Sequence, residues 1–153
     1  MAPCVHEAGH AVIAHLLGAR VAHVRIAGGG VGSGDSLIGT EEPRISVYVR
    51  VAGYPAELRY CEMVGDCPAD RHPIHSAHDD DERAWASAQE ACPGDIAAAA
   101  ALLTEARESV GMMVAQEWGR IERVARALFD SPDGFLQSGL LSLLLDAPEA
   151  PRG

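Results

Sequence analysis

The sequence predicts a mainly α-helical (α+β) domain with a small β-sheet or hairpin beside its first helix. Apolar residues make up 48% of the chain and aromatic residues only 5%, so we expect a core of Ala, Val and Leu, which suits closely packed helices. Most segments carry apolar residues at helical spacing. The length of 153 residues suits one domain with one core, and we expect residues 1–147 to form it and residues 148–153 to be a disordered tail.

The first helix is expected from about Pro3 to Leu17. A Pro suits an early helical position, and the following Gly18 suits a helix end. Residues 21–26 predict a strand, because Val21, Val24 and Ile26 are β-branched and polar residues lie among them. The glycine-rich segment 28–39 is typical of a mobile loop or an irregular edge strand flanking a cleft.

Residues 44–51 (RISVYVRV) are ambiguous. Their strict alternation of β-branched residues favours a strand. The preceding Thr40-Glu41-Glu42-Pro43 is typical of a helix start, which favours a helix. Local propensity favours the strand, and the residues alone leave both open.

The rest of the chain predicts helices separated by loops, because apolar spacing is helical and is interrupted by Pro, Gly and Asp clusters. In order, we expect a helix over 53–64, a loop over 65–78, a helix over 79–91, one long helix from Ile96 to about Phe129 with bends at Gly111 and Gly119, a turn over 130–134, and a short helix from Phe135 to Leu145.

The charged residues and the cysteines exclude several classes of function. The formal net charge is −10 and all 12 basic residues are Arg, which argues against a nucleic-acid partner. A chain without Lys has no Walker A loop and hence no P-loop ATPase. No apolar run is long enough to span a membrane and no signal peptide is evident, so we expect a cytoplasmic protein with its four Cys as reduced thiols.

The strongest functional signal is the pentapeptide His6-Glu7-Ala8-Gly9-His10. Two His four residues apart lie on one face of a helix, so both imidazoles can hold one metal ion. Glu7 is placed to take a proton from the attacking water. This is the H-E-x-x-H pattern of zinc peptidases, and it predicts zinc as the cofactor, with His6 and His10 as ligands and Glu7 as the catalytic base.

A catalytic zinc needs a third protein ligand, and spacing alone does not choose it. The candidates are carboxylates and imidazoles later in the chain: Glu57, His72, His75, His78, Asp79, Asp80 and Asp81. A second, structural zinc site built from Cys61, Cys67, His72 and His75 is disfavoured, because its spacing is looser than that of zinc fingers.

Four stretches resemble the peptidase domain of FtsH-type ATP-dependent zinc proteases. Residues 6–18 (HEAGHAVIAHLLG) closely resemble the start of that domain. Residues 52–58 (AGYPAEL) are similar to its Gly-Gly-Arg-Ala-Ala-Glu-Glu stretch, and residues 76–84 (SAHDDDERA) to its Gly-Ala-Ser-Asn-Asp-Leu-Glu-Arg-Ala segment. Residues 106–128 are similar to its long last helix. The resemblance therefore runs in the same order over most of the chain.

This resemblance implies a ligand set and a fold for the ambiguous segment. The Asp that is the family's third zinc ligand falls on Asp80, with Asp79 and Asp81 as the alternatives. Glu57 becomes a structural carboxylate or one that orients a ligand His. Residues 44–51 become a helix. The ATPase module and the membrane anchor of the family are not in this sequence, and segment 28–39 matches the family's substrate-binding edge strand poorly, so the substrate stays open.

We therefore expect a stand-alone zinc metalloendopeptidase acting on peptides or unfolded protein segments. Two alternatives remain: a non-catalytic zinc-binding relative that serves as an interaction module, and a peptidase subunit of a separate ATPase. A homo-oligomer is also considered.

Overall fold

The computed structural model describes residues 1–26, 34–39, 42–65 and 78–147. Its elements, in chain order, are α1 (Ala2–Leu16), β1 (Arg20–Ile26), β2 (Gly34–Gly39), α2 (Pro43–Arg50), α3 (Gly53–Val64), α5 (His78–Ala91), α6 (Ile96–Gln116), α7 (Trp118–Asp130), β3 (Phe135–Gln137) and α8 (Ser138–Asp146). The predicted mainly α fold with a small sheet is confirmed.

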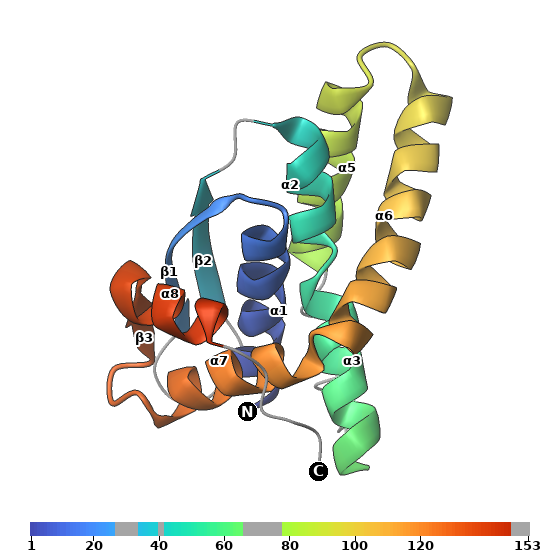
Figure 1. Cartoon of the computed structure of the whole chain (residues 1–153). Coiled ribbons are helices and arrows are strands. Elements are labelled where there is room, and N and C mark those ends of the chain that lie inside the picture. The colour runs from blue at the N-terminus through green and yellow to red at the C-terminus, as the bar shows by residue number, and fades with distance from the viewer. Residues whose placement is uncertain (27–33, 40–41, 66–77, 148–153) are drawn as a thin grey trace.

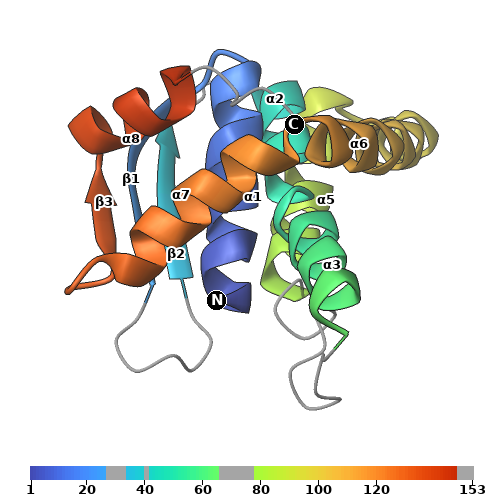
Figure 2. The ribbon, with the colours of Figure 1, turned by 60° about the horizontal axis from the view of Figure 1, so that its bottom comes forward.

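Helix α1 lies in the middle of the molecule, with the sheet and α8 on one side and α2, α3, α5 and α6 on the other (Figures 1 and 2). The described sheet has the order β2-β1-β3, and both pairings are antiparallel. Helix α1 packs against α3, α7 and β1. The predicted sheet beside the first helix is therefore present.

The central position of α1 follows from its sequence. Every residue from Cys4 to Ala14 is buried. A helix that is apolar around most of its circumference must be covered on all sides. His6, Glu7 and His10 lie within this buried run, so the fold places three polar side chains of the H-E-x-x-H motif in the core.

Helices α1 and α3 approach each other closely at Gly9. A Cβ atom at this position would lie 2.8 Å from the Ala52 carbonyl oxygen and 2.8 Å from the Ala56 Cβ, closer than side chains pack. The Gly inside the motif therefore allows α1 to lie against the start of α3.

The ambiguous segment is a helix, α2. Pro43 occupies the first turn, where its missing N–H costs nothing. Val47, Val49 and Val51 are all buried, although they do not share one helical face. This is accommodated because α2 packs against α1, α5 and α6. Tertiary burial therefore overrides the local preference of these β-branched residues for a strand.

Two expectations about the C-terminal half were wrong. The predicted single helix over 96–129 is two helices, separated at Glu117 (φ −96°, ψ 17°) rather than bent at Gly111 or Gly119. Trp118 begins α7 and is 8% exposed, and α7 then packs against α1. Helical spacing continues through this break, so the sequence pattern does not reveal it.

The last helix begins three residues later than predicted. Phe135–Gln137 form strand β3, which pairs with residues 23–25 of β1, and only Ser138–Asp146 are helical. The preceding turn over 130–134 is confirmed and ends at Gly134, whose φ of 63° suits Gly. The strand exists because a distant strand supplies its hydrogen-bond partners, which local propensity cannot indicate.

The other predicted helices and the first strand are confirmed within one or two residues, as α1, α3, α5 and β1. The glycine-rich segment contributes the edge strand β2, and residues 27–33 lie outside the described residues. Residues 66–77 of the predicted loop and the predicted tail over 148–153 also lie outside them.

Two expectations drawn from composition have different outcomes. No helix in the described ranges is long and apolar enough to cross a membrane.

Cys4 and Cys92 are free thiols as expected, but Cys61 is disulfide-bonded, so the expectation of four reduced thiols was wrong. A disulfide is typical of oxidising compartments, and the cytoplasmic location therefore stays a prediction. The disulfide also removes Cys61 from the alternative structural zinc site.

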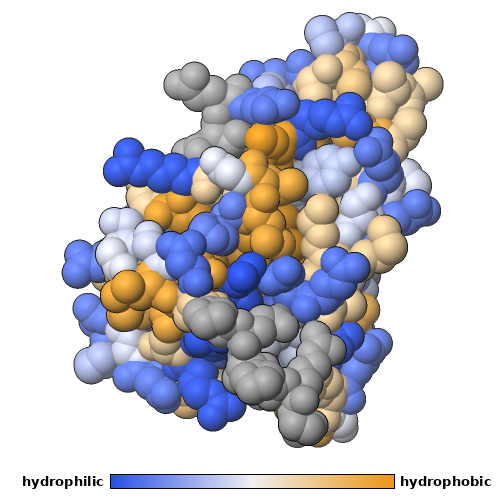
Figure 3. Space-filling model, viewed as in Figure 1, coloured by the Kyte–Doolittle hydropathy of each residue, from blue (hydrophilic) through white to orange (hydrophobic). Residues whose placement is uncertain are grey.

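The surface mixes polar and apolar side chains. On the face seen in Figure 1, apolar side chains gather near the centre and at the left, among hydrophilic side chains and side chains of intermediate hydropathy (Figure 3). Leu140 and Leu143 on α8 are among the exposed apolar residues, at 46% and 72%. Apolar atoms contribute much of any folded surface, so single exposed leucines need no special function.

Candidate metal centre

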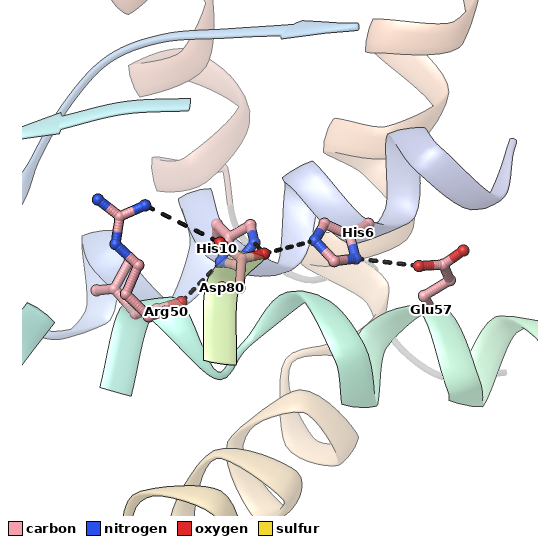
Figure 4. A network of polar contacts seen from close by, with 6 residues as sticks. His6, His10, Arg50, Glu57 and Asp80 are labelled. Carbon is pink, nitrogen blue, oxygen red and sulfur yellow. Dashed lines mark hydrogen bonds and ion pairs between the residues drawn. The ribbon is translucent and has the colours of Figure 1, made fainter. Parts of the chain in front are cut away.

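Three side chains from two helices that are far apart in the sequence lie close together. Helix α1 supplies His6 and His10, and the first turn of α5 supplies Asp80 (Figure 4). Asp80 Oδ2 lies 3.0 Å from His6 Nε2 and 3.1 Å from His10 Nε2. One ligand atom from each residue lies within 4.8 Å of the other two. These are the three residues that the sequence and the resemblance together predict as ligands, and their role in binding metal stays a prediction.

In each imidazole, the outer nitrogen is Nδ1, which does not face Asp80, and it makes a hydrogen bond of its own. His6 Nδ1 donates to Glu57 Oε2 at 3.0 Å, and His10 Nδ1 donates to the Val49 carbonyl oxygen at 2.7 Å. A neutral imidazole with its proton on Nδ1 carries its lone pair on Nε2. Both hydrogen bonds therefore favour the tautomer whose Nε2 can bind a metal, and both orient the rings. The contact of Glu57 with His6 is consistent with the orienting role that the resemblance implies, and that role stays a prediction.

The site is nearly enclosed and is most accessible at Asp80. His6, His10 and Glu57 are 5%, 3% and 5% exposed, whereas the Asp80 side chain is 19% exposed. A catalytic metal needs one position open to water and substrate. The exposure of Asp80 places the accessible side of the site at the start of α5.

In the metal-free protein, the pKa values of His6 and Asp80 are shifted in opposite directions. Burial lowers the pKa of His6, but its hydrogen bonds to Asp80 and Glu57 outweigh burial and raise that pKa from 6.5 to about 9. Burial raises the pKa of Asp80, but hydrogen bonds from His10 and His6 hold it well below its usual range. These shifts favour a protonated His6 imidazole beside an ionised Asp80 carboxylate in the metal-free protein.

Gly53 leaves space beside both imidazoles. A Cβ atom on Gly53 would lie 2.4 Å from His6 Nε2 and 2.6 Å from His10 Nε2. Zinc–nitrogen bonds measure about 2.0–2.1 Å, so this Cβ would occupy nearly the volume that a shared ion needs. The absence of a side chain at the start of α3 leaves that volume open, and the residues present fit a metal ion.

Glu7 lies directly after His6 and is 6% exposed. Its negative charge contributes to the raised pKa of His6, so its carboxylate acts electrostatically on the site. A buried carboxylate next to a metal-binding imidazole can serve as a general base. Its place on α1 is consistent with the predicted role.

The other candidate third ligands are placed differently. The Asp81 carboxylate pairs with Arg107 at 3.0 Å. Asp79 and His78 are exposed, and His78 lies 3.7 Å from Glu82. His78, Asp79 and Glu82 also lie close enough together to hold an ion, but all three are exposed, and exposed groups rich in acidic residues are common without an ion. His72 and His75 lie outside the described residues.

Sequence reasoning missed three contributors: the Val49 carbonyl, Arg50, whose Nη1 lies 3.9 Å from Asp80 Oδ1, and the space at Gly53. A backbone carbonyl carries no sequence signal. Gly53 does lie in the stretch that resembles the FtsH family, but its contact with both His is visible only in the fold. No protein-family model and no curated protein matches this chain, so its functional assignment rests on the motif, the resemblance and this geometry.

Proposed function

We propose that this chain is a zinc-dependent metalloendopeptidase related to the peptidase domain of FtsH-type proteases. The observation that carries the proposal is the convergence of His6 Nε2, His10 Nε2 and Asp80 Oδ2, with Gly53 leaving space beside the two imidazoles. Both imidazoles are oriented through their outer nitrogens, as is usual for metal-binding His. His, His and carboxylate with one accessible position is a common ligand set of catalytic zinc.

Zinc in this site would supply Lewis-acid polarisation of a peptide carbonyl and would lower the pKa of a coordinated water to about 7. Glu7 takes the proton of the attacking water and passes it to the leaving amine. His6 and His10 hold their orientation through Glu57 and the Val49 carbonyl. The substrate enters on the accessible side near Asp80. Strand β2 is an edge of the described sheet, and an extended peptide can pair with such an edge.

Two other functions use the same site. A non-catalytic relative would bind zinc as a structural element and present its surface to a partner. A peptidase subunit would receive unfolded chains from a separate ATPase. The buried Glu7 favours catalysis over a purely structural site, because a structural zinc has no need of a base. Acting alone, the chain would cleave peptides and unfolded segments, since it has no Walker A loop.

Asp80→Ala should lose zinc, whereas Asp81→Ala should keep it. Asp80 is the third member of the cluster, and Asp81 pairs with Arg107 instead. We expect about one zinc per wild-type chain by mass spectrometry, about one in Asp81→Ala, and an affinity reduced by about 100-fold or more in Asp80→Ala, because two ligands hold zinc far less well than three. Cleavage of an unstructured protein should follow zinc content.

Equal zinc content in both Asp variants would show that Asp80 is not a ligand. A wild-type chain that binds no zinc would exclude the proposed peptidase. A wild-type chain that binds zinc and cleaves neither peptides nor unfolded proteins, alone or with cell extract, would favour the non-catalytic relative.

Zinc affinity should fall as the pH is lowered from about 9 to 6.5. The folded-state pKa of His6, about 9, exceeds its ordinary value of 6.5, so below pH 9 the metal-free site holds a proton that zinc must displace. This proton alone weakens zinc binding by about tenfold for each pH unit below 9. Competition with a chelator of known affinity at several pH values measures the slope. A flat profile would mean that His6 is neutral in the metal-free protein.

A further inference from the structure

Each of the three proposed ligands has an outer partner, and all three partners come from one short segment. Glu57 contacts the outer nitrogen of His6, and the Val49 carbonyl contacts that of His10. Arg50 faces the outer oxygen of Asp80. We call residues 49–57 the α2–α3 corner. This corner also contains Gly53, the residue that leaves space for the ion.

The two oxygens of the Asp80 carboxylate have different neighbours. Arg50 Nη1 lies 3.9 Å from Oδ1, while Oδ2 lies 3.0 and 3.1 Å from the two Nε2 atoms. Figure 4 shows the guanidinium on the opposite side of Asp80 from His6. The Arg50 side chain is 38% exposed, so it approaches the carboxylate from the solvent side.

Building on the zinc site proposed above, we propose that Arg50 is a positioning residue that holds Asp80 as a one-oxygen ligand. Its charge attracts Oδ1 and thereby keeps Oδ2 directed at the ion. Outer partners of metal ligands orient them and tune their strength. The distance is that of an ion pair rather than a hydrogen bond, so positive charge matters more here than the forked geometry of Arg.

A carboxylate without such a partner can rotate and present both oxygens to the metal. Binding through two oxygens would take the position that water or a carbonyl needs. Arg50 therefore has a predicted effect on coordination as well as on affinity, and this separates it from a residue that only stabilises the fold.

The test compares Arg50→Met and Arg50→Lys with Arg44→Met. Arg44 is on the same helix and pairs with Glu105 at 3.0 Å, away from the site, which makes it a matched control. We expect zinc affinity to fall by about tenfold in Arg50→Met, at the lower end of the range for outer partners. Arg50→Lys should recover most of that loss, and Arg44→Met should bind zinc as the wild type does.

Two further measurements show that Arg50 acts through Asp80. In an Asp80→Asn background, Arg50→Met should cause no additional loss of affinity, because the charge it attracts is gone. In the Co²⁺-loaded protein, Arg50→Met should weaken the visible absorption bands, which lose intensity when the coordination number rises.

The proposal is overturned if Arg50→Met binds zinc like the wild type, or if its loss is the same with Asn at position 80. In either case the zinc site stands, because wild-type binding is measured in parallel. Absence of zinc binding by the wild type overturns the zinc site and the role of Arg50 together. Helix content by circular dichroism identifies a variant that fails to fold. If Arg50→Met fails to fold, the zinc affinity of Arg50→Lys is measured as the test.

Discussion

Gly53→Ala should abolish zinc binding while leaving the helices folded. The new methyl group would lie 2.4–2.6 Å from three atoms of His6 and His10, in the volume where an ion would bind both rings. Either the imidazoles move apart or the ion is displaced. We expect zinc affinity to fall by at least about 100-fold, more than the loss of an outer partner causes. Competition with a chelator measures the loss, and circular dichroism measures the helix content.

The matched control is Gly111→Ala in α6. A Cβ at Gly111 meets no atom within 4 Å, so this substitution tests the same chemical change on an open helix face. It should bind zinc normally and should be slightly more stable, since Ala favours helix over Gly by about 1 kcal/mol. Normal zinc binding by Gly53→Ala would show that no ion lies between His6 and His10.

Glu7→Gln should keep zinc and lose peptidase activity. Gln has nearly the same shape as Glu, so the buried position stays filled, but the neutral amide cannot accept the proton of the attacking water. General-base catalysis contributes about 10²- to 10⁴-fold, and we expect kcat to fall by that factor. Cleavage of an unstructured protein measures the rate, and mass spectrometry measures the zinc in the same samples.

Glu105→Gln serves as the control for this change. Glu105 is on α6, is half exposed, and accepts hydrogen bonds from Tyr48 and Arg44 away from the metal centre. Its loss should leave both zinc and activity unchanged. Full activity in Glu7→Gln would assign the proton transfer to another group, and loss of zinc would give Glu7 a structural role instead.

Much of the fold could be predicted because its signals are local. The apolar spacing, the early Pro3 and the following Gly18 predict a helix from about Pro3 to Leu17, and the structure has a helix over Ala2–Leu16. The three Asp at the start of α5 favour a helix N-terminus through its dipole. The break at Glu117 and strand β3 could not be predicted, because each depends on packing against a distant element, α7 on α1 and β3 on β1.

The candidate site also has some features that the local sequence predicts and others that depend on distant packing. His6 and His10 share a face on any helix that contains both, so the sequence alone pairs them. Among three adjacent acids, the residues themselves do not distinguish Asp80 from Asp79 or Asp81. The packing of α5 against α2 and α6 makes that choice, with Asp80 directed toward His6 and His10 and Asp81 toward Arg107.

The sequence by itself therefore determined the mainly helical class, and it predicted the pair of His and the neighbouring carboxylate of Glu7, because each depends on helical periodicity within a few residues. Only the tertiary structure decided which acid joins the pair, what orients each ring and where an ion has space. Those features depend on the α2–α3 corner. Val49, Gly53 and Glu57 lie against His side chains of α1, about 40 to 50 positions earlier in the chain. Arg50 lies against Asp80, about 30 positions later. Contacts over such separations are set by the packing of helices and not by the local sequence.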